Sequence, residues 1–282
     1  MVPSVEITSL SHQFSGQTVL NEVSLSIQPG EAVAIVGRNG AGKTTLVKHM
    51  NGLLHPHKGR ILTCGLDTVG VSVAVLAQTV GFVFQNPDDQ IFCRSVEQEI
   101  AWGPKHLGFP SAKIKKNVEN AIAATGLNNM EKVNPLDLSL AKKKMLCLAS
   151  VLAMDTGLLV LDEPTMGQDL AGKQRITSIL DELKHQGKTV VAVTHDMDFC
   201  ADIFERILVL EKGRLILDGT CEQLFNNPDF QTRGGILPPQ VWQLGQKLGL
   251  APTPWTAAQL LERLHTNTPA APANRVEKRK TP

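Results

Sequence analysis

A glycine-rich segment, GRNGAGKTT at residues 37–45, directly follows the apolar run AVAIV at residues 32–36. Five consecutive apolar residues predict a strand buried on both faces, which occurs mainly in parallel sheets covered by helices. The segment matches the pattern G-x-x-x-x-G-K-[ST], whose glycines let backbone amides surround a polyphosphate at the start of a helix. The sequence therefore predicts a strand, a phosphate-binding loop, and a helix that begins near Lys43.

Other strand patterns extend this prediction to a fold class. Alternating apolar and polar residues at 4–14 and 19–27 predict two antiparallel strands near the N-terminus. Short apolar runs at 81–84, 158–161 and 189–194 are separated by helical patterns, which is typical of a mostly parallel sheet covered by helices. The pattern at 206–219 predicts a hairpin that turns at Lys212 and Gly213. We expect an α/β fold of the P-loop NTPase type with an N-terminal antiparallel β subdomain.

The remaining stretches suggest how the chain is divided. Between residues 95 and 155 the strand signal disappears, and helical patterns with breaks at Pro104, Gly108 and Pro135 predict an inserted helical subdomain. We expect one ATPase-sized domain at 4–235 and a small extension with two short amphipathic helices at 236–265. The final stretch, 266–282, has the composition of a disordered tail.

Composition narrows the class of partner. The chain has 282 residues with 28 basic and 27 acidic side chains, which gives no electrostatic argument for nucleic acid as the main partner. Five scattered cysteines without a C-x-x-C pair predict reduced cytosolic thiols. The N-terminus does not resemble a secretory signal, and the most apolar run falls short of the ~20 residues that span a bilayer. We expect any work at a membrane to be done from outside it.

Two adjacent carboxylates follow the apolar run LLVL at residues 158–161. Such a strand would deliver Asp162 to the carboxyl edge of the sheet, where it could hold Mg²⁺, and would place Glu163 beside it to polarise an attacking water molecule. The alternative is that the pair caps a helix. The phosphate loop elsewhere in the chain favours the catalytic interpretation.

Two further polar residues are predicted to reach the same edge. His195, in VTHD, follows the strand at 189–194 and could sense the γ-phosphate of a nucleotide; a structural histidine or a helix cap with Asp196 is the alternative. Gln85 ends the strand at 81–84, where its amide could reach the metal or the water. A polar turn at NPDD is the alternative there.

These motifs, in this order and with Leu-Ser at a helix start, resemble the nucleotide-binding subunit of an ABC transporter. The stretch VGFVFQNPDDQIFCRSVEQEIAWGPKHLGF at residues 80–109 is similar to the ATPase subunits of energy-coupling factor (ECF) transporters, which import vitamins and transition-metal ions. The resemblance covers about residues 4–265, and in that family the C-terminal extension helps the ATPases dimerise. It implies an ATP hydrolase with ATP and Mg²⁺ as cofactors.

Roles carry over from the family by position. Phe14 takes the place of the aromatic residue that stacks on adenine. The resemblance implies Glu163, His195 and Gln85 as catalytic residues, and Thr44, Asp162 and Gln85 as the Mg²⁺ site. The implied ATP-binding residues are Phe14, Gly37, Arg38, Asn39, Gly40, Ala41, Gly42, Lys43, Thr44, Thr45 and Ser139.

The family also implies partners and a location. The subunit would lie peripherally at the cytoplasmic face of the cell membrane, bound to an integral membrane coupling subunit. A separate membrane subunit would choose the cargo, so the sequence does not name it. The helix around SVEQEIAWGP would face the coupling subunit, with Phe92 and Trp102 either as contact residues or as core.

The chain departs from the family where a partner ATPase should meet it. The family motif L-S-G-G-Q closes over the nucleotide of the opposite subunit, and its two glycines allow close backbone approach. Here Ser139 is followed by Leu140, Ala141 and three lysines, which either add charge near phosphate or form a solvated face. Gln168, in TMGQD, is a second departure, and the uncharged stretch at 69–80 is a third.

Because both sites of a homodimer would contain the altered segment, we expect a heterodimer with a second ABC ATPase, in which one site is competent. Two alternatives remain open. The chain could be a regulatory ATP-binding subunit with little hydrolysis, or a soluble ABC ATPase that does not serve transport.

Overall fold

The chain divides into two compact units, Met1–Pro238 and Pro239–Pro282. The first unit contains two sheets. The computed structural model describes residues 2–227, 229, 232–233 and 235–267. The smaller sheet has the order β2-β1-β4-β5 and the larger one β10-β9-β3-β8-β7-β6. The strands of the first sheet are β1 (Val5–Phe14), β2 (Gln17–Ile27), β4 (Lys58–Thr63) and β5 (Leu66–Asp67). Those of the second are β3 (Ala32–Val36), β6 (Val80–Val83), β7 (Leu158–Asp162), β8 (Thr189–Val193), β9 (Arg206–Glu211) and β10 (Arg214–Gly219).

The larger sheet is mostly parallel, as the apolar runs predicted. The strand pairs β3 with β8, β7 with β8, β6 with β7, and β3 with β9 are all parallel, and only β10 runs antiparallel. All five residues of β3, β7 and β8 are buried, which fits their continuous apolar sequences. The carboxyl ends of β3, β8, β7 and β6 therefore lie side by side along one edge of the sheet.

The smaller sheet and the terminal hairpin also match the prediction. Strands β1 and β2 are antiparallel over Val5↔Ile27 to Phe14↔Gln17. Strands β9 and β10 turn at Lys212 and Gly213, both with positive φ, which suits a tight hairpin turn.

Helix α1 (Lys43–Met50) lies between the two sheets, because it contacts β2 and β4 on one side and β7 and β8 on the other. Its residues Leu46, Val47 and Met50 are fully buried and join the apolar side chains of both sheets in one core. Helices α6 (Leu170–His185) and α7 (Met197–Ile203) pack on each other, and α6 also contacts β8.

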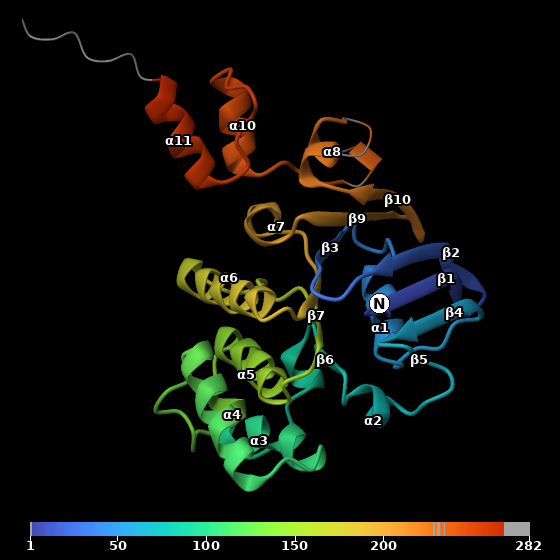
Figure 1. Ribbon diagram of the computed structural model, residues 1–282, viewed down its shortest axis with the longest axis vertical. Helices are drawn as coiled ribbons and strands as arrows, with labels where there is room; N and C mark the ends of the chain where they lie inside the picture. Colours follow the sequence, from blue (N-terminus) through green and yellow to red (C-terminus); the bar gives the residue numbers. More distant parts are fainter. Residues whose placement is uncertain (1, 228, 230–231, 234, 268–282) are drawn as a thin grey trace, which may run out of the picture. The chain divides into compact units, whose positions relative to one another are not determined.

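The inserted segment forms a cluster of helices, drawn in green to yellow-green in Figure 1. It consists of α3 (Val96–His106), α4 (Ser111–Thr125) and α5 (Leu140–Ala153), which contact one another, with the 3-10 turns η1 (Pro87–Asp89) and η2 (Pro135–Asp137). The predicted break at Pro104 is wrong, because Pro104 lies buried inside α3. A proline removes one helical hydrogen bond, and α3 continues for only two residues beyond it before Gly108 with φ +73 follows.

The uncharged stretch at 69–80 contains one helical turn, α2 (Val73–Leu76). Leu76 is fully buried, whereas Val69, Val73 and Val75 are 57%, 44% and 38% exposed. This stretch thus leaves apolar side chains at the surface. Helix α8 (Cys221–Phe225) follows β10 and begins with a capping box at Thr220.

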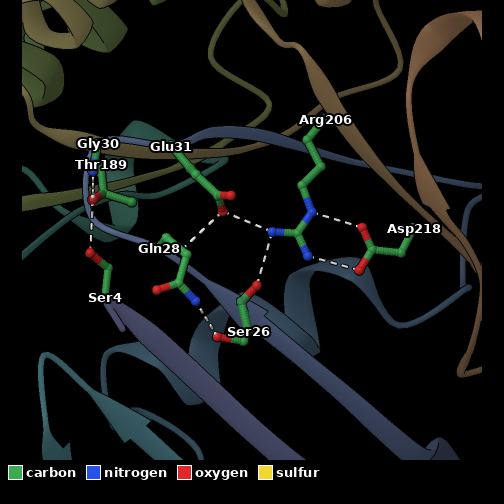
Figure 2. A network of polar contacts seen from close by, with 8 residues as sticks. All are labelled: Ser4, Ser26, Gln28, Gly30, Glu31, Thr189, Arg206 and Asp218. Carbon is green, nitrogen blue, oxygen red and sulfur yellow. Dashed lines mark hydrogen bonds and ion pairs between the residues drawn. The ribbon is translucent and has the colours of Figure 1, made fainter. Parts of the chain in front are cut away.

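Figure 2 shows polar contacts that join the two sheets around Arg206 on β9. The guanidinium donates to both oxygens of Asp218 at 2.7 and 2.8 Å and to Glu31 Oε2 at 2.8 Å. It also donates to the main-chain carbonyl of Ser26 on β2 at 2.9 Å. The hydrogen bonds with Asp218 raise the pKa of Arg206. One side chain therefore holds β2, the start of β3, and β10 together.

The second unit contains α10 (Gln240–Lys247) and α11 (Ala257–Asn267), as the amphipathic patterns predicted. Within it, the rings of Trp242 and Trp255 stack with centroids 6.0 Å apart. Helix α11 includes residues 266–267, where the sequence predicted the start of a tail; the remainder of that tail, 268–282, lies outside the described residues. Among the described residues, no helix combines the length and apolar character that crossing a bilayer requires.

Candidate functional site

The loop at residues 37–45 leaves β3 and enters α1 through left-handed backbone that only glycine adopts easily. Gly37 has φ +147, and a Cβ there would collide with the carbonyl oxygen of Leu210. Gly42, the N-cap of α1, has φ +102, and a Cβ there would lie 2.8 Å from Leu20 Cδ2. Because both glycines also lack space for a side chain, the loop follows the path that presents backbone amides to an anion at a helix N-terminus.

Lys43 lies inside this loop rather than in solvent. Its side chain is 8% exposed, and its ammonium donates to the carbonyls of Gly37 at 2.7 Å and Arg38 at 3.1 Å. Burial lowers the pKa of Lys43, while the charges of Glu163 and Asp162 oppose that shift. The ammonium is thus held where a phosphate bound by the loop would meet it.

Thr44 and Asp162 meet across the edge of the sheet. The Thr44 side chain lies next to the Asp162 carboxylate, and Asp162 is 2% exposed. Burial raises the pKa of Asp162, and Asp162 Oδ1 has no hydrogen-bond partner among the described residues. A buried carboxylate oxygen without a partner, next to a hydroxyl, fits Mg²⁺, which is commonly held by one or two carboxylates together with substrate phosphates.

Glu163 occupies an unusual backbone position directly after β7. Its φ is +52, its N–H donates to the Val193 carbonyl at 2.9 Å, and its side chain is 9% exposed. His195 Nδ1 lies 2.8 Å from Glu163 Oε2, although this oxygen lacks a well-aligned hydrogen bond among the described residues. The imidazole and the carboxyl group are therefore in close contact. The predicted neighbours Asp162, Glu163 and His195 therefore do come together at one edge.

The helix cap given as an alternative at His195 is present, and Asp196 forms it. Asp196 caps α7 by accepting from Phe199 N at 3.2 Å, and it also accepts from Lys173 Nζ at 2.6 Å. His195, with a side chain 69% exposed, is not a buried structural histidine. Gln85 is exposed at the same sheet edge beyond β6, but no described contact joins it to Asp162 or Thr44.

Phe14 lies at the end of β1, next to the hairpin turn, and is 48% exposed. Three histidines that the sequence analysis did not single out accompany it. The His12 ring meets Phe14, His49 and His57 edge-on with centroids 4.6 to 4.7 Å apart. Since His49 belongs to α1, this cluster connects the ring of Phe14 to the helix that follows the phosphate loop.

The altered segment forms the start of α5. Ser139 is its N-cap and accepts from Lys142 N at 3.4 Å, while Leu140 is 50% exposed. Ser139 and Phe14 have no described contact with the loop at 37–45 within this chain. The structure does not bring either of them to the Asp162 edge.

The idea that the three lysines form a solvated face is wrong for two of them. Lys143 Nζ donates to Asp88 at 2.8 Å, and Lys144 is 5% exposed and donates to the Glu163 carbonyl at 2.7 Å. These partners also take both ammonium groups away from a role as phosphate ligands at the start of α5. Of the three lysines, only Lys142 is exposed.

The first two departures from the family pattern touch each other. Gln168 Nε2 donates to the Ala141 carbonyl at 3.0 Å, and Leu140 packs beside Gly167. The start of α5 is thus linked to the loop that follows Glu163. No local sequence pattern indicates this link, because 27 positions separate Gln168 from Ala141.

Phe92 and Trp102 are surface residues, which excludes the core alternative. They are 62% and 44% exposed, and their rings meet edge-on at 5.0 Å. Together with Leu53, Val73 and Met154 they line a cavity of about 230 Å³. Val73 belongs to the uncharged stretch at 69–80, so that stretch contributes to the same apolar surface.

Comparisons with known proteins agree with this arrangement. The family model described as ABC transporter matches residues 20–166. The energy-coupling factor transporter ATP-binding protein EcfA2 of Methanospirillum hungatei is 39% identical over 251 residues, which are 88% of this chain and 63% of that protein. EcfA2 of Clostridium tetani is 36% identical over 255 residues, 87% of this chain and 88% of that protein. The chain thus spans less than two thirds of the first of these relatives and most of the second.

A solved structure gives the same answer for the fold. CbiO1 of Clostridium perfringens, part of the ABC transporter complex cbiONQ, superposes with a TM-score of 0.73 at 31% identity and covers 89% of this chain and 100% of that chain. The expected fold class and the resemblance to ECF ATPase subunits are confirmed. The chain belongs to the ABC transporter family, as an ATP-binding subunit of the type found in ECF transporters.

Proposed function

We propose that this chain binds and hydrolyses ATP to energise the import of a vitamin or a transition-metal ion through an ECF-type transporter. The observation that carries the proposal is the meeting of Thr44, Asp162, Glu163 and His195 beside the loop that holds Lys43. The similarity to proteins named EcfA2 supports the transporter type. The cargo is chosen elsewhere, in a separate membrane subunit.

Each residue has a role in the proposed reaction. The amides of residues 37–45 and the Lys43 ammonium bind the phosphates, and Phe14 stacks on the adenine. Thr44 and Asp162 would hold Mg²⁺, with Gln85 reaching it from the same edge; when bound, the ion offsets the negative charge of the phosphates. Glu163 orients and polarises the attacking water, and His195 contacts the γ-phosphate from its exposed position next to Glu163.

A second ATPase completes the site. We infer a heterodimer, because Leu140 places an exposed branched side chain where close backbone approach to a phosphate is needed. The partner's glycine-rich segment would then close over this chain's nucleotide, and the altered segment would close over the partner's. Ser139 remains the one residue of the altered segment that can contribute a hydroxyl to a phosphate.

The apolar surface around Phe92 and Trp102 is proposed to receive the membrane-embedded coupling subunit at the cytoplasmic face of the cell membrane. Large aromatic residues with high exposure are enriched at protein interfaces. In this division of labour, residues 4–235 form the ATPase domain with the helical subdomain at 95–155, and residues 236–265 serve dimerisation.

The test is to tag this chain, copurify its complex from the native membrane, and measure phosphate release. We expect the complex with Glu163→Gln to retain ATP binding and lose turnover by at least about 100-fold. The untagged accompanying subunits should include a second ATPase and membrane proteins. Full turnover in the Glu163→Gln complex, or turnover by this chain alone equal to that of the complex, would contradict the proposal.

The regulatory alternative rests on the altered segment alone. It predicts that Glu163→Gln in this chain leaves the turnover of the complex unchanged, while the corresponding substitution in the partner ATPase abolishes it. The same purified complexes therefore separate the two functions.

A further inference from the structure

Lys144 is a buried ammonium group that the proposed reaction leaves without a role. It lies in the middle of the apolar face of α5, between buried Met145 and half-buried Lys143, and is itself 5% exposed. A buried charge without a partner is costly. Its ammonium donates a hydrogen bond to the main-chain carbonyl of Glu163, at 2.7 Å.

We propose that Lys144 is a positioning residue for Glu163: its ammonium holds the Glu163 carbonyl and thereby fixes the direction in which the carboxylate projects. The inference rests on the proposed role of Glu163 in hydrolysis. It adds a residue from the helical subdomain to the machinery at the edge of the sheet.

The backbone of Glu163 needs such a support. Its φ of +52 lies in the left-handed region, which a residue with a Cβ occupies only where surrounding contacts hold it. On one side its N–H donates to Val193 on β8 at 2.9 Å. On the other side its carbonyl accepts the Lys144 ammonium, together with a longer bond of 3.3 Å from Met166 N. Of these three hydrogen-bond partners of the Glu163 main chain among the described residues, only Lys144 comes from outside the sheet and the loop that follows β7.

The charges around Lys144 favour its retention as an ammonium. Burial lowers the pKa of Lys144, but the nearby Glu163 and Asp162 act in the opposite direction. A charged donor also makes a stronger hydrogen bond than a neutral one. The contact therefore combines a strong bond to the Glu163 backbone with an attraction to the two carboxylates.

The contact also connects two sites. Helix α5 begins at the altered segment, which faces the nucleotide of the partner subunit in the proposed dimer. Gln168 Nε2 fastens the same helix to the loop after Glu163 through the Ala141 carbonyl at 3.0 Å. Helix α5 therefore contacts both the main chain of Glu163 and the loop that follows it.

The experiment uses the complex copurified from the native membrane, with full-length chain carrying Lys144→Met, Lys144→Gln or Lys144→Arg. Met and Gln both end one atom short of the lysine nitrogen. Met removes the donor and keeps an apolar side chain, whereas Gln keeps a polar group that is too short to reach the carbonyl. Arg keeps a charged donor. The matched control is Lys143→Met, which removes the adjacent charge from the same helix. Glu163→Gln is measured in parallel, and kcat and the KM for ATP are determined for each complex.

We expect Lys144→Met and Lys144→Gln to lower kcat at least about tenfold with the KM for ATP within about twofold, because the phosphate loop is untouched. Lys144→Arg should recover at least about a third of the lost kcat, and Lys143→Met should stay within about twofold of the parent. Should Lys144→Met fail to fold, Lys144→Gln decides by the same thresholds.

Two results would overturn the inference: a kcat within about twofold of the parent in both neutral variants, or a loss of kcat matched by Lys143→Met. A rise in KM in step with the loss of kcat would show a structural role and overturn it as well. If Glu163→Gln keeps full turnover, the proposed function fails first. If Glu163→Gln is inactive while the neutral Lys144 variants are normal, only the role of Lys144 is lost.

Discussion

The phosphate loop at residues 37–45 and the altered segment at residues 139–144 both open a helix, yet they present different chemistry. The loop has glycine at Gly37 and Gly42, where a side chain would collide with neighbouring atoms, and Lys43 lies within the loop against the Gly37 carbonyl. The altered segment caps its helix with the Ser139 hydroxyl and then exposes Leu140. In the proposed dimer, this chain would thus supply one complete half of a nucleotide sandwich, and its other half would be altered by the bulk of Leu140 rather than by loss of the helix.

The largest effect is expected from removing Lys43, the buried lysine of the phosphate loop. Lys43→Ala leaves the loop carbonyls of Gly37 and Arg38 without their donor and removes the charge that would meet a phosphate. We expect the ATP turnover of the complex to fall at least about 100-fold, with weaker ATP binding. Steady-state kinetics and titration with a fluorescent ATP analogue provide the measurements. Lys115→Ala, on the surface of α4, is the control; an active Lys43→Ala complex would end the comparison.

The free energy of unfolding should depend on pH through His49, on the helix that follows the phosphate loop. Burial lowers the pKa of His49, on α1, from 6.5 to about 4, and its side chain is fully buried. Between these values the unfolded chain binds the proton and the folded chain does not, so stability is lost as the pH falls through 6.5 towards 4. At pH 5 this costs about 2 kcal/mol relative to pH 8.

Urea unfolding of the full chain at both pH values measures that loss. The His49→Gln variant is the control, because it removes this proton while the other histidines still titrate. The difference between pH 8 and pH 5 should be smaller in the variant by about 2 kcal/mol. Equal differences in the two proteins would mean that His49 does not titrate in this way.

Restoring glycine in the blunted half should repair it. The double substitution Leu140→Gly and Ala141→Gly permits close backbone approach, at the cost of some helix stability. We expect the chain alone, without its partner, to hydrolyse ATP about tenfold faster than the parent. Phosphate release is the measurement, and the same double substitution with Glu163→Gln is the control. If the substituted chain hydrolyses ATP no faster than the parent, then features other than the side chains of Leu140 and Ala141 limit the altered segment.

The smallest effect is expected at the contact between Gln168 and Ala141, two positions that differ from the family pattern. Gln168→Ala removes the hydrogen bond to the Ala141 carbonyl, which is partly exposed. We expect a change of about threefold in kcat for the complex. Gln174→Ala, on the exposed part of α6, is the control, and identical kinetics for both variants would leave the link without a role.

Much of the complete half could be predicted because its signals are local. The apolar run before Gly37, the glycines of the loop, and the strand that ends at Asp162 are all read within a few neighbouring residues. The structure adds what depends on distant partners. Lys144 and Glu163 are 19 positions apart, and nothing near Lys144 in the sequence distinguishes it from exposed Lys142.

The helical subdomain shows the same limit. Pro104 and Pro135 are both typical helix breakers, but only Pro135 lies outside an α-helix. Phe92 and Trp102 are aromatic residues whose burial the sequence left open, because it depends on which helices surround them. The structure exposes both.

The contacts of Arg206 bear on how this chain would hold the two ends of a nucleotide. They clamp the sheet that carries Phe14 to the start of β3, which leads into the phosphate loop. In the proposed site, one rigid frame would therefore hold both base and phosphates, with its span set before the ligand arrives. The difference between three phosphates and two would then be sensed outside that frame, by the helices and the proposed partner subunit.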